Sequence, residues 1–219
     1  MKKSNVGLVL FAVVLCALLF CPLKGYADTV TLTLVSVGGQ SSGSNSGVYV
    51  YPYNFSIDGS ATLTPLMCLN YENEVYIGES WQANLVPVTG TQYVEAGYIF
   101  SLANAPGASP TAIAKAQWAN WELFDSGDAN LLGNVPAGYQ GDINTILANA
   151  LAFAQADPNT SQFDNYNIFI PIAGSQSEGG TPQTFFGDPP VPEPSSYLLF
   201  GTGLLGLAAF LYRRRSVTL

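Results

Sequence analysis

The pattern of polar and apolar residues in the first part of the chain predicts β-strands. Residues 29–37 alternate strictly between polar and apolar, as in a half-buried strand. Residues 48–57 are aromatic and rich in β-forming residues, and Asp58-Gly59 after them is a hairpin turn signal. We expect residues 61–69 to return as the partner strand, where Pro65 indicates an edge or a bulge.

The middle of the chain changes to helical spacing. Ser109 is a good N-cap and Pro110 suits the first helical position, so a helix is expected to begin there. Further helices are expected at residues 93–103 and 142–156, before a closing strand at residues 163–172. The whole pattern predicts a mainly β, β-sandwich-like fold with a helical insertion of two or three helices.

The expected domain boundaries follow from the same pattern. The β-rich outer domain is expected to span residues 28–172, with the helical insertion at about residues 92–156. From residue 173 onward Gly, Ser, Gln and Pro predominate, and a segment of this composition packs poorly. Residues 173–190 are therefore expected to form a flexible stalk.

The N-terminal segment has the order of a secretory signal peptide. It opens with Met1-Lys2-Lys3, continues with an apolar run at residues 6–20 and ends in small residues up to Ala27. The alternative is an N-terminal membrane anchor, but the run is short for a span of about 20 residues. We expect a signal peptide over residues 1–27, cleaved between Ala27 and Asp28.

The C-terminal segment has three parts in a fixed order. Val191-Pro192-Glu193-Pro194 comes first, an uncharged run at residues 197–212 follows, and Arg213-Arg214-Arg215 comes last. We expect a single transmembrane helix at about residues 195–212, with the arginines cytoplasmic and the outer domain facing outward. A plain tail anchor explains the apolar run and the arginines, but it does not explain the Pro-Glu-Pro before them.

This three-part arrangement over residues 191–215 resembles the PEP-CTERM sorting signal, a motif also labelled ice-binding protein C-terminal domain. The resemblance implies recognition by an exosortase, a membrane-embedded cysteine transpeptidase, with cleavage near the Pro-Glu-Pro. It also implies exopolysaccharide as a partner and a link to biofilm. An amine-bearing surface is the partner that the thioester hypothesis described below would require. The expected location is the membrane, facing outward, and then the cell surface or extracellular matrix after processing.

Charge and composition narrow the function classes. The only basic residue between Asp28 and Pro190 is Lys115, and the chain carries a net charge of −8. Phosphate backbones would be repelled by this surface, so a nucleic-acid partner is not expected. The chain has no histidine, which removes the usual general base and the commonest metal ligand. We expect neither an enzyme nor a cofactor.

The helix that begins after Ser109 carries a glutamine on its apolar face. Ile113, Gln117 and Trp121 follow one another at helical spacing. A primary amide in an apolar stripe is costly unless its hydrogen bonds are made. One interpretation is that Gln117 binds the backbone of a loop, and that Cys68, the only cysteine after residue 27, is a small buried apolar side chain.

The other interpretation pairs Gln117 with Cys68. Met67-Cys68-Leu69 and the later Gln117-x-x-x-Trp121 pattern resemble the two motifs of surface proteins with thioester domains. That resemblance implies that the cysteine attacks the glutamine amide, ammonia leaves, and an amine on a partner later takes up the acyl group. Asn120 stands where that family more usually has an apolar residue.

Three weaker candidates remain. Glu72 and Glu74, with Asp164, are the carboxylates that a secreted polysaccharide hydrolase would use. A calcium site with oxygen ligands would use Asp125, Asp128 and Asn130, although their spacing is not that of an EF-hand. Alternating aromatic residues are expected to pack as a sheet face, and would stack on sugars only where exposed; they are Tyr49, Tyr51, Tyr53 and Phe55.

Three functions are therefore open. The first is an exported, surface-anchored or matrix-associated protein without enzymatic activity, processed by an exosortase. The second is a covalent adhesin with an internal thioester between Cys68 and Gln117. The third is a secreted polysaccharide hydrolase. Separation of Cys68 from Gln117 in space would exclude the second, and absence of a concave cleft with two carboxylates would exclude the third.

Overall fold

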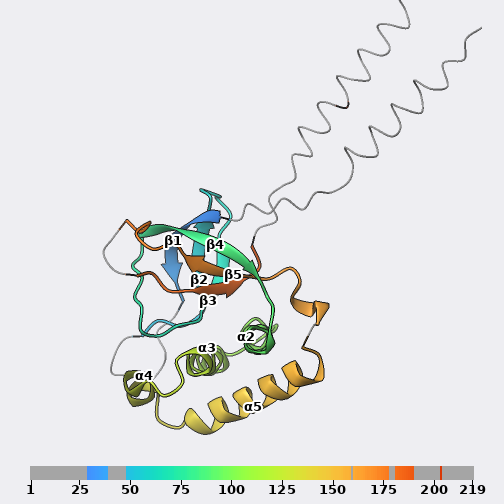
Figure 1. Cartoon of the computed structure of the whole chain (residues 1–219). Coiled ribbons are helices and arrows are strands. Elements are labelled where there is room, and N and C mark those ends of the chain that lie inside the picture. Colours follow the sequence, from blue (N-terminus) through green and yellow to red (C-terminus); the bar gives the residue numbers. More distant parts are fainter. Residues whose placement is uncertain (1–28, 39–47, 159, 178–180, 190–202, 204–219) are drawn as a thin grey trace, which may run out of the picture.

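Six antiparallel strands close into a barrel, and helices cover one end of it (Figure 1). The computed structural model describes residues 29–38, 48–158, 160–177, 181–189 and 203. The strand order around the barrel is β1-β2-β3-β6-β5-β4. The strands are β1 (Thr29–Val37), β2 (Tyr53–Ile57), β3 (Thr64–Cys68), β4 (Ser80–Pro87), β5 (Asn167–Pro171) and β6 (Phe185–Gly187).

The predicted β-sandwich is wrong, because the sheet closes on itself. Leu32 of β1 lies opposite Ile57 of β2 on one side and opposite Trp81 of β4 on the other. The short strand β6 closes the circle between β3 and β5. Alternation along a strand shows that one face is buried, and this is equally true of a sandwich and of a barrel.

The prediction of a flexible stalk over residues 173–190 is wrong for Phe185–Gly187, which form β6. All three residues of this strand are buried. The chain before it is also held, since Ser175 and Ser177 bond the backbone of β4. The Gly- and Pro-rich composition of the segment gave no sign of a strand. Of its two partners, β3 is distant in sequence, and β5 is separated from β6 by a loop.

Aromatic side chains fill the interior of the barrel. Phe55, Trp81 and Phe185 come from three different strands and are almost completely buried. The ring centroids of Phe55 and Phe185 are 4.7 Å apart, and those of Phe55 and Trp81 are 5.6 Å apart, both with edge-to-face geometry. Such pairs are worth about 0.5–1.5 kcal/mol each beyond the burial of their area.

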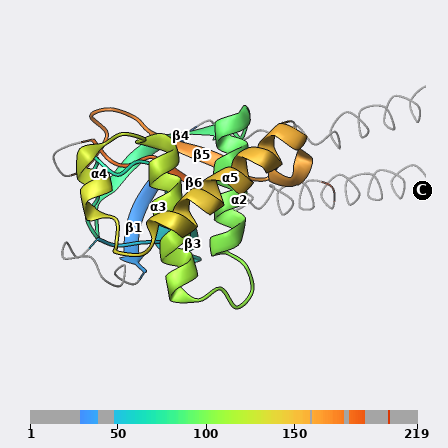
Figure 2. The same ribbon diagram turned by 90° about the horizontal axis from the view of Figure 1, so that it is seen from below.

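Four α-helices lie in the chain between β4 and β5, where two or three were expected. The additional helix is α4, a six-residue segment too short to show helical periodicity in the sequence. Figure 2 shows the helices from below, where α2, α3 and α5 extend across the end of the barrel. The helices are α2 (Thr91–Ala103), α3 (Pro110–Phe124), α4 (Ala129–Asn134) and α5 (Gln140–Ala156), and a 3-10 turn, η1 (Ser161–Phe163), follows them.

The predicted start of α3 is confirmed. The hydroxyl of Ser109 accepts a hydrogen bond from the backbone N–H of Ala112 at 3.2 Å, and Pro110 is the first helical residue. Farther along α3, Lys115 forms an ion pair with Asp142 of α5 and lies 5.2 Å from the ring centroid of Tyr139. The N-cap fixes where the helix begins, and the ion pair connects α3 to α5.

Close packing between the helices depends on one glycine. Gly97 lies in α2 and faces Phe163 of η1; a Cβ atom at this position would lie 2.7 Å from a ring carbon of Phe163. Tyr98 of α2 packs against Phe153 of α5 with a centroid distance of 5.2 Å. The absence of a side chain at Gly97 therefore allows η1 to approach α2.

In the part of the chain that the structure describes, no helix has the length and apolar character needed to cross a membrane. The fold predicted from the sequence included such a helix at about residues 195–212, and that segment lies outside the described residues except for residue 203. The predicted signal peptide with its cleavage site at Ala27 and Asp28 lies outside them as well, as do the sorting residues Val191, Pro192, Glu193, Pro194, Arg213, Arg214 and Arg215.

Candidate functional site

The structure brings Cys68 and Gln117 together. Cys68 is the last residue of β3, and Gln117 lies in the middle of α3. Both residues are completely buried. The side-chain nitrogen Nε2 of Gln117 donates a hydrogen bond of 2.7 Å to the backbone oxygen of Cys68, across 49 residues of sequence. The two residues are thus adjacent, and the contact is made to the backbone of Cys68, not to its thiol.

A second amide shares the same acceptor. Nδ2 of Asn120, one helical turn after Gln117, donates to the backbone oxygen of Cys68 at 2.9 Å. The side-chain oxygens Oε1 of Gln117 and Oδ1 of Asn120 are buried and have no hydrogen-bond partner among the described residues. An unpaired buried oxygen costs about 1–3 kcal/mol, and native proteins keep few of them. The unpaired oxygens of the two amides therefore lower the free energy of unfolding.

The thiol of Cys68 is enclosed and protonated. Its Sγ donates to the backbone oxygen of Asn70 at 3.1 Å. Burial raises the pKa of the thiol to about 12. At neutral pH the residue is thus a neutral thiol in an apolar pocket, the state of a structural cysteine rather than of an activated nucleophile.

Three aromatic side chains surround this region. The ring centroids of Tyr71 and Trp121 are 5.2 Å apart, and those of Trp118 and Trp121 are 5.0 Å apart. Asp125, which ends α3, accepts a hydrogen bond from the backbone N–H of Tyr71. The loop after β3 is therefore held against the C-terminal end of the same helix that carries Gln117.

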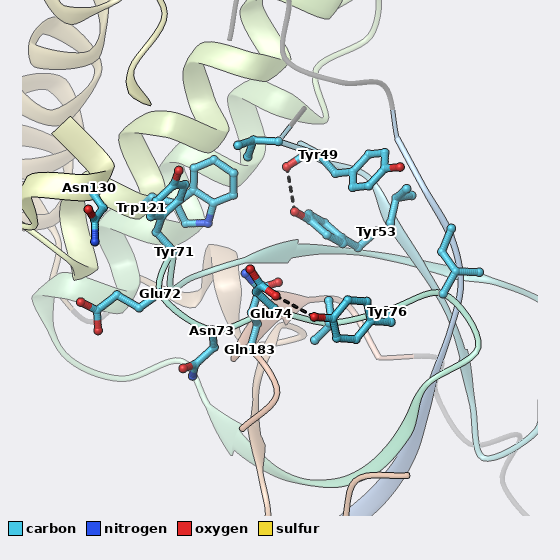
Figure 3. A pocket seen from close by; sticks show the side chains of 14 residues that line it. Tyr49, Tyr53, Tyr71, Glu72, Asn73, Glu74, Tyr76, Trp121, Asn130 and Gln183 are labelled. Carbon is cyan, nitrogen blue, oxygen red and sulfur yellow. Dashed lines mark hydrogen bonds between the residues drawn. The ribbon is translucent and has the colours of Figure 1, made fainter. Parts of the chain in front are cut away.

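A groove of about 870 Å³ lies directly beside this aromatic cluster (Figure 3). Trp121 lines the groove and follows Gln117 by one turn of α3. The remaining labelled side chains of the groove are aromatic, acidic or amide; they are Tyr49, Tyr53, Tyr71, Tyr76, Glu72, Glu74, Asn73, Asn130 and Gln183. One wall of the groove is thus shared with the Cys68–Gln117 site.

The sequence did not predict this groove. Tyr76, Asn73 and Gln183 were not singled out, because they lie in loops without any periodic pattern. The only available signal was the density of Asn, Tyr and Glu at residues 70–76. Gln183 also lines the groove, although it is distant from residues 70–76 in sequence. Its side chain donates a hydrogen bond to the backbone oxygen of Asn70 at 3.1 Å.

The carboxylates of the hydrolase hypothesis are partly separated. Glu72 and Glu74 both line the groove, whereas Asp164 ends η1 and is not among the lining residues. Oε2 of Glu74 accepts a hydrogen bond of 2.7 Å from the hydroxyl of Tyr76. A hydrogen bond to Asp128 raises the pKa of Glu72. A concave cleft with two carboxylates is present, and both carboxylates already have polar partners.

The weak calcium candidates have structural partners. Oδ1 of Asp128 accepts from the backbone N–H of Leu131 at 2.6 Å and so caps α4, while Asp125 holds Tyr71. Asn130 lines the groove. The residues that the structure describes contain no group of three or more His, Cys, Asp or Glu able to hold a metal ion.

The alternating aromatic residues mainly form a packed face, as expected. Tyr51, Tyr53 and Phe55 are buried in the core. Tyr49 differs, because 44% of it is exposed and it lines the groove. The hydroxyl of Tyr53 donates a hydrogen bond to the backbone oxygen of Tyr49 at 2.8 Å (Figure 3). This bond fixes the backbone that carries the exposed ring of Tyr49.

Comparison with protein families gives a match at the C-terminal end. Residues 190–215 match the model of the PEP-CTERM protein-sorting motif. This match confirms the resemblance drawn from the Pro-Glu-Pro and the arginine cluster. Searches among curated proteins and solved structures found no match. The sorting motif marks an exported protein that an exosortase recognises and that is anchored transiently at the membrane.

Proposed function

We propose that this exosortase-sorted protein acts without enzymatic turnover as a covalent adhesin, through an internal thioester between Cys68 and Gln117. The observation that carries the proposal is the 2.7 Å hydrogen bond from Nε2 of Gln117 to the backbone oxygen of Cys68. Complete burial of both residues would protect a thioester from hydrolysis by bulk water, and a partner's amine could reach it only after neighbouring side chains move.

The chemistry balances without an external oxidant or cofactor. The sulfur of Cys68 attacks the side-chain carbonyl carbon of Gln117, an S–C bond forms, and the C–N bond breaks. The thiol proton leaves with the nitrogen as ammonia. A primary amine of the partner then attacks the same carbon, which forms an amide and returns the proton to the sulfur of Cys68. Each copy of the protein reacts once.

Asn120 stands where thioester domains more usually have an apolar residue, and in this scheme it has a role of its own. Loss of ammonia removes the nitrogen with which Gln117 binds the backbone oxygen of Cys68. Asn120 donates to the same oxygen and stays in place. The acceptor therefore keeps one donor in the acylated state, which avoids a buried unpaired carbonyl.

A second candidate is a surface or matrix protein that holds exopolysaccharide without a covalent bond. In that case the contact between Gln117 and Cys68 only fastens β3 to α3, and the groove makes the contact with the partner. The fastening role explains the hydrogen bond. It leaves the mass of the chain unchanged, which distinguishes it from the thioester.

The test is the intact mass of the full chain, purified in mild detergent, before and after treatment with methylamine. We expect a mass lower than the sequence requires by one ammonia, and covalent addition of methylamine. The matched controls are Cys68→Ala and Gln117→Ala, which keep the fold but cannot form the bond. The full sequence mass, unchanged by methylamine, would exclude the thioester.

A further inference from the structure

The groove beside the Cys68–Gln117 site has a chemistry that thioester formation itself does not require. Two of its tyrosines present large apolar surfaces to solvent, with 44% of Tyr49 and 54% of Tyr76 exposed. Figure 3 shows Tyr49 with Tyr53 on one side of the groove and Tyr76 with Glu74 on the other. Exposed aromatic rings in a concave surface are a common feature of ligand-binding sites.

The polar side chains of the groove suit hydroxyl and ammonium groups. Amides both donate and accept hydrogen bonds, as sugar hydroxyls do, and three of them line the groove. Glu72 and Glu74 add negative charge, and no lysine or arginine is among the lining residues. Lys115 pairs with Asp142 on the helical side of the molecule. The groove is therefore electrostatically complementary to a cationic ligand.

We propose that this groove binds an oligosaccharide that carries free amino groups, and that a sugar amine is the nucleophile for the thioester. The covalent step rests on the function proposed above, whereas the binding step does not. The apolar faces of pyranose rings stack on Tyr49 and Tyr76, and the ammonium group lies near the carboxylates of Glu72 and Glu74. Trp121, which lines the groove and follows Gln117 by one turn of α3, connects the binding site to the proposed reacting pair.

The fold favours a sugar over a lysine-bearing peptide. An extended peptide commonly binds by adding a strand to an open sheet edge. The six described strands close into a barrel, so the sheet beside the groove offers no such edge. A lysine side chain is narrow, and its ammonium group needs only one or two hydrogen-bond acceptors. The breadth of the groove, its exposed rings and its several amides match a chain of sugar rings better.

The binding step is tested on the full-length Cys68→Ala variant, so that no covalent bond interferes. Short glucosamine oligomers are titrated by isothermal calorimetry, with fully N-acetylated oligomers and a lysine-rich peptide as competing ligands. We expect saturable binding of the glucosamine oligomers only. Adding Tyr76→Ala or Glu74→Gln is expected to weaken it about tenfold, which corresponds to about 1.4 kcal/mol.

The matched controls are Leu151→Ala and Asp157→Asn, which change an exposed apolar and an acidic residue outside the groove. Neither is expected to alter the affinity. The proposal is overturned by failure of the glucosamine oligomers to bind, by equal affinity for the acetylated oligomers or the peptide, or by unchanged affinity in both groove variants. Wild-type protein of full sequence mass that still binds glucosamine oligomers would exclude the thioester and leave the groove assignment intact.

Discussion

At the scale of single residues, the junction of β3 with α3 is organised around one backbone oxygen. Cys68 supplies that oxygen, and the side chains of Gln117 and Asn120 both donate to it. Each amide leaves its own oxygen without a partner among the described residues. Unpaired oxygens lower the free energy of unfolding, so substitutions of Gln117 and Asn120 are informative.

Asn120→Leu removes one of the two donors while keeping a side chain of similar size. We expect a smaller fraction of thioester, because in the acylated state the oxygen of Cys68 would lose its remaining donor at a cost of about 1–3 kcal/mol. The fraction is measured as the mass deficit of one ammonia, and thermal unfolding verifies that the variant is folded. An unchanged deficit in a folded variant would contradict the role given to Asn120.

The raised pKa of Cys68 predicts a pH-dependent stability. Burial raises the thiol pKa from 9.0 to about 12 in the folded protein. The unfolded chain therefore loses this proton at lower pH, and stability falls as pH rises from about 9 toward 12. In Gln117→Ala, which keeps the thiol free, we expect a loss of about 1 kcal/mol between pH 8 and pH 10 from this group.

The measurement is urea unfolding at the two pH values, compared with the double variant Cys68→Ala/Gln117→Ala. The double variant retains the buried tyrosines, whose own titration contributes equally to both proteins. The difference between the two variants therefore isolates the thiol. Identical pH dependence in the two would mean that the thiol has an ordinary pKa.

The proximity of Cys68 and Gln117 could be predicted from the sequence, and the groove could not. Cys68 and Gln117 were found because each lies in a regular element with a short motif around it. Tyr76 and Gln183 lie in loops that are far apart in sequence and meet only after the barrel has closed. A local sequence pattern contains no information about contacts between loops that are distant in sequence.

At the scale of elements, the approach of η1 to α2 depends on the missing side chain of Gly97. Gly97→Ala would bring a Cβ atom to 2.7 Å from the ring of Phe163. We expect destabilisation by about 1–3 kcal/mol, despite the better helix propensity of alanine. Urea unfolding of the full chain measures the change.

Gly141→Ala is the matched control within α5. A Cβ atom there has no neighbour within 4 Å, and the backbone is already helical. We expect this variant to be stabilised by up to about 1 kcal/mol. Equal effects of the two substitutions would show that the contact with Phe163 relaxes without cost.

Elements with strong local signals were predicted, and those defined by distant partners were missed. The strand β1 and the capped start of α3 have the expected positions, since alternation and an N-cap are visible in the local sequence. The strand β6 has three residues in a Gly- and Pro-rich segment, and only its pairing with β3 and β5 defines it. This one strand makes the difference between an open sheet and a barrel.

At the scale of the whole molecule, the sorting motif at residues 190–215 is separate from the barrel in sequence. Deletion of these residues is expected to abolish membrane anchoring and leave the barrel folded. Cell fractionation with an antibody against the outer domain measures where the protein accumulates, and Cys68→Ala serves as a control that keeps the motif. Unchanged retention in the membrane fraction would contradict the role of the motif.

The ion pair between Lys115 and Asp142 has a consequence for protein displayed in a dense layer. Each copy then meets its neighbours far more often than it meets a foreign surface. Lys115 is the only side-chain amine between Asp28 and Pro190, and it is held against Asp142 and the ring of Tyr139. Under the proposed function, Lys115 of a neighbouring copy would therefore be a poor nucleophile for the acyl group. Crosslinking between copies through this lysine would be disfavoured relative to reaction with a foreign amine.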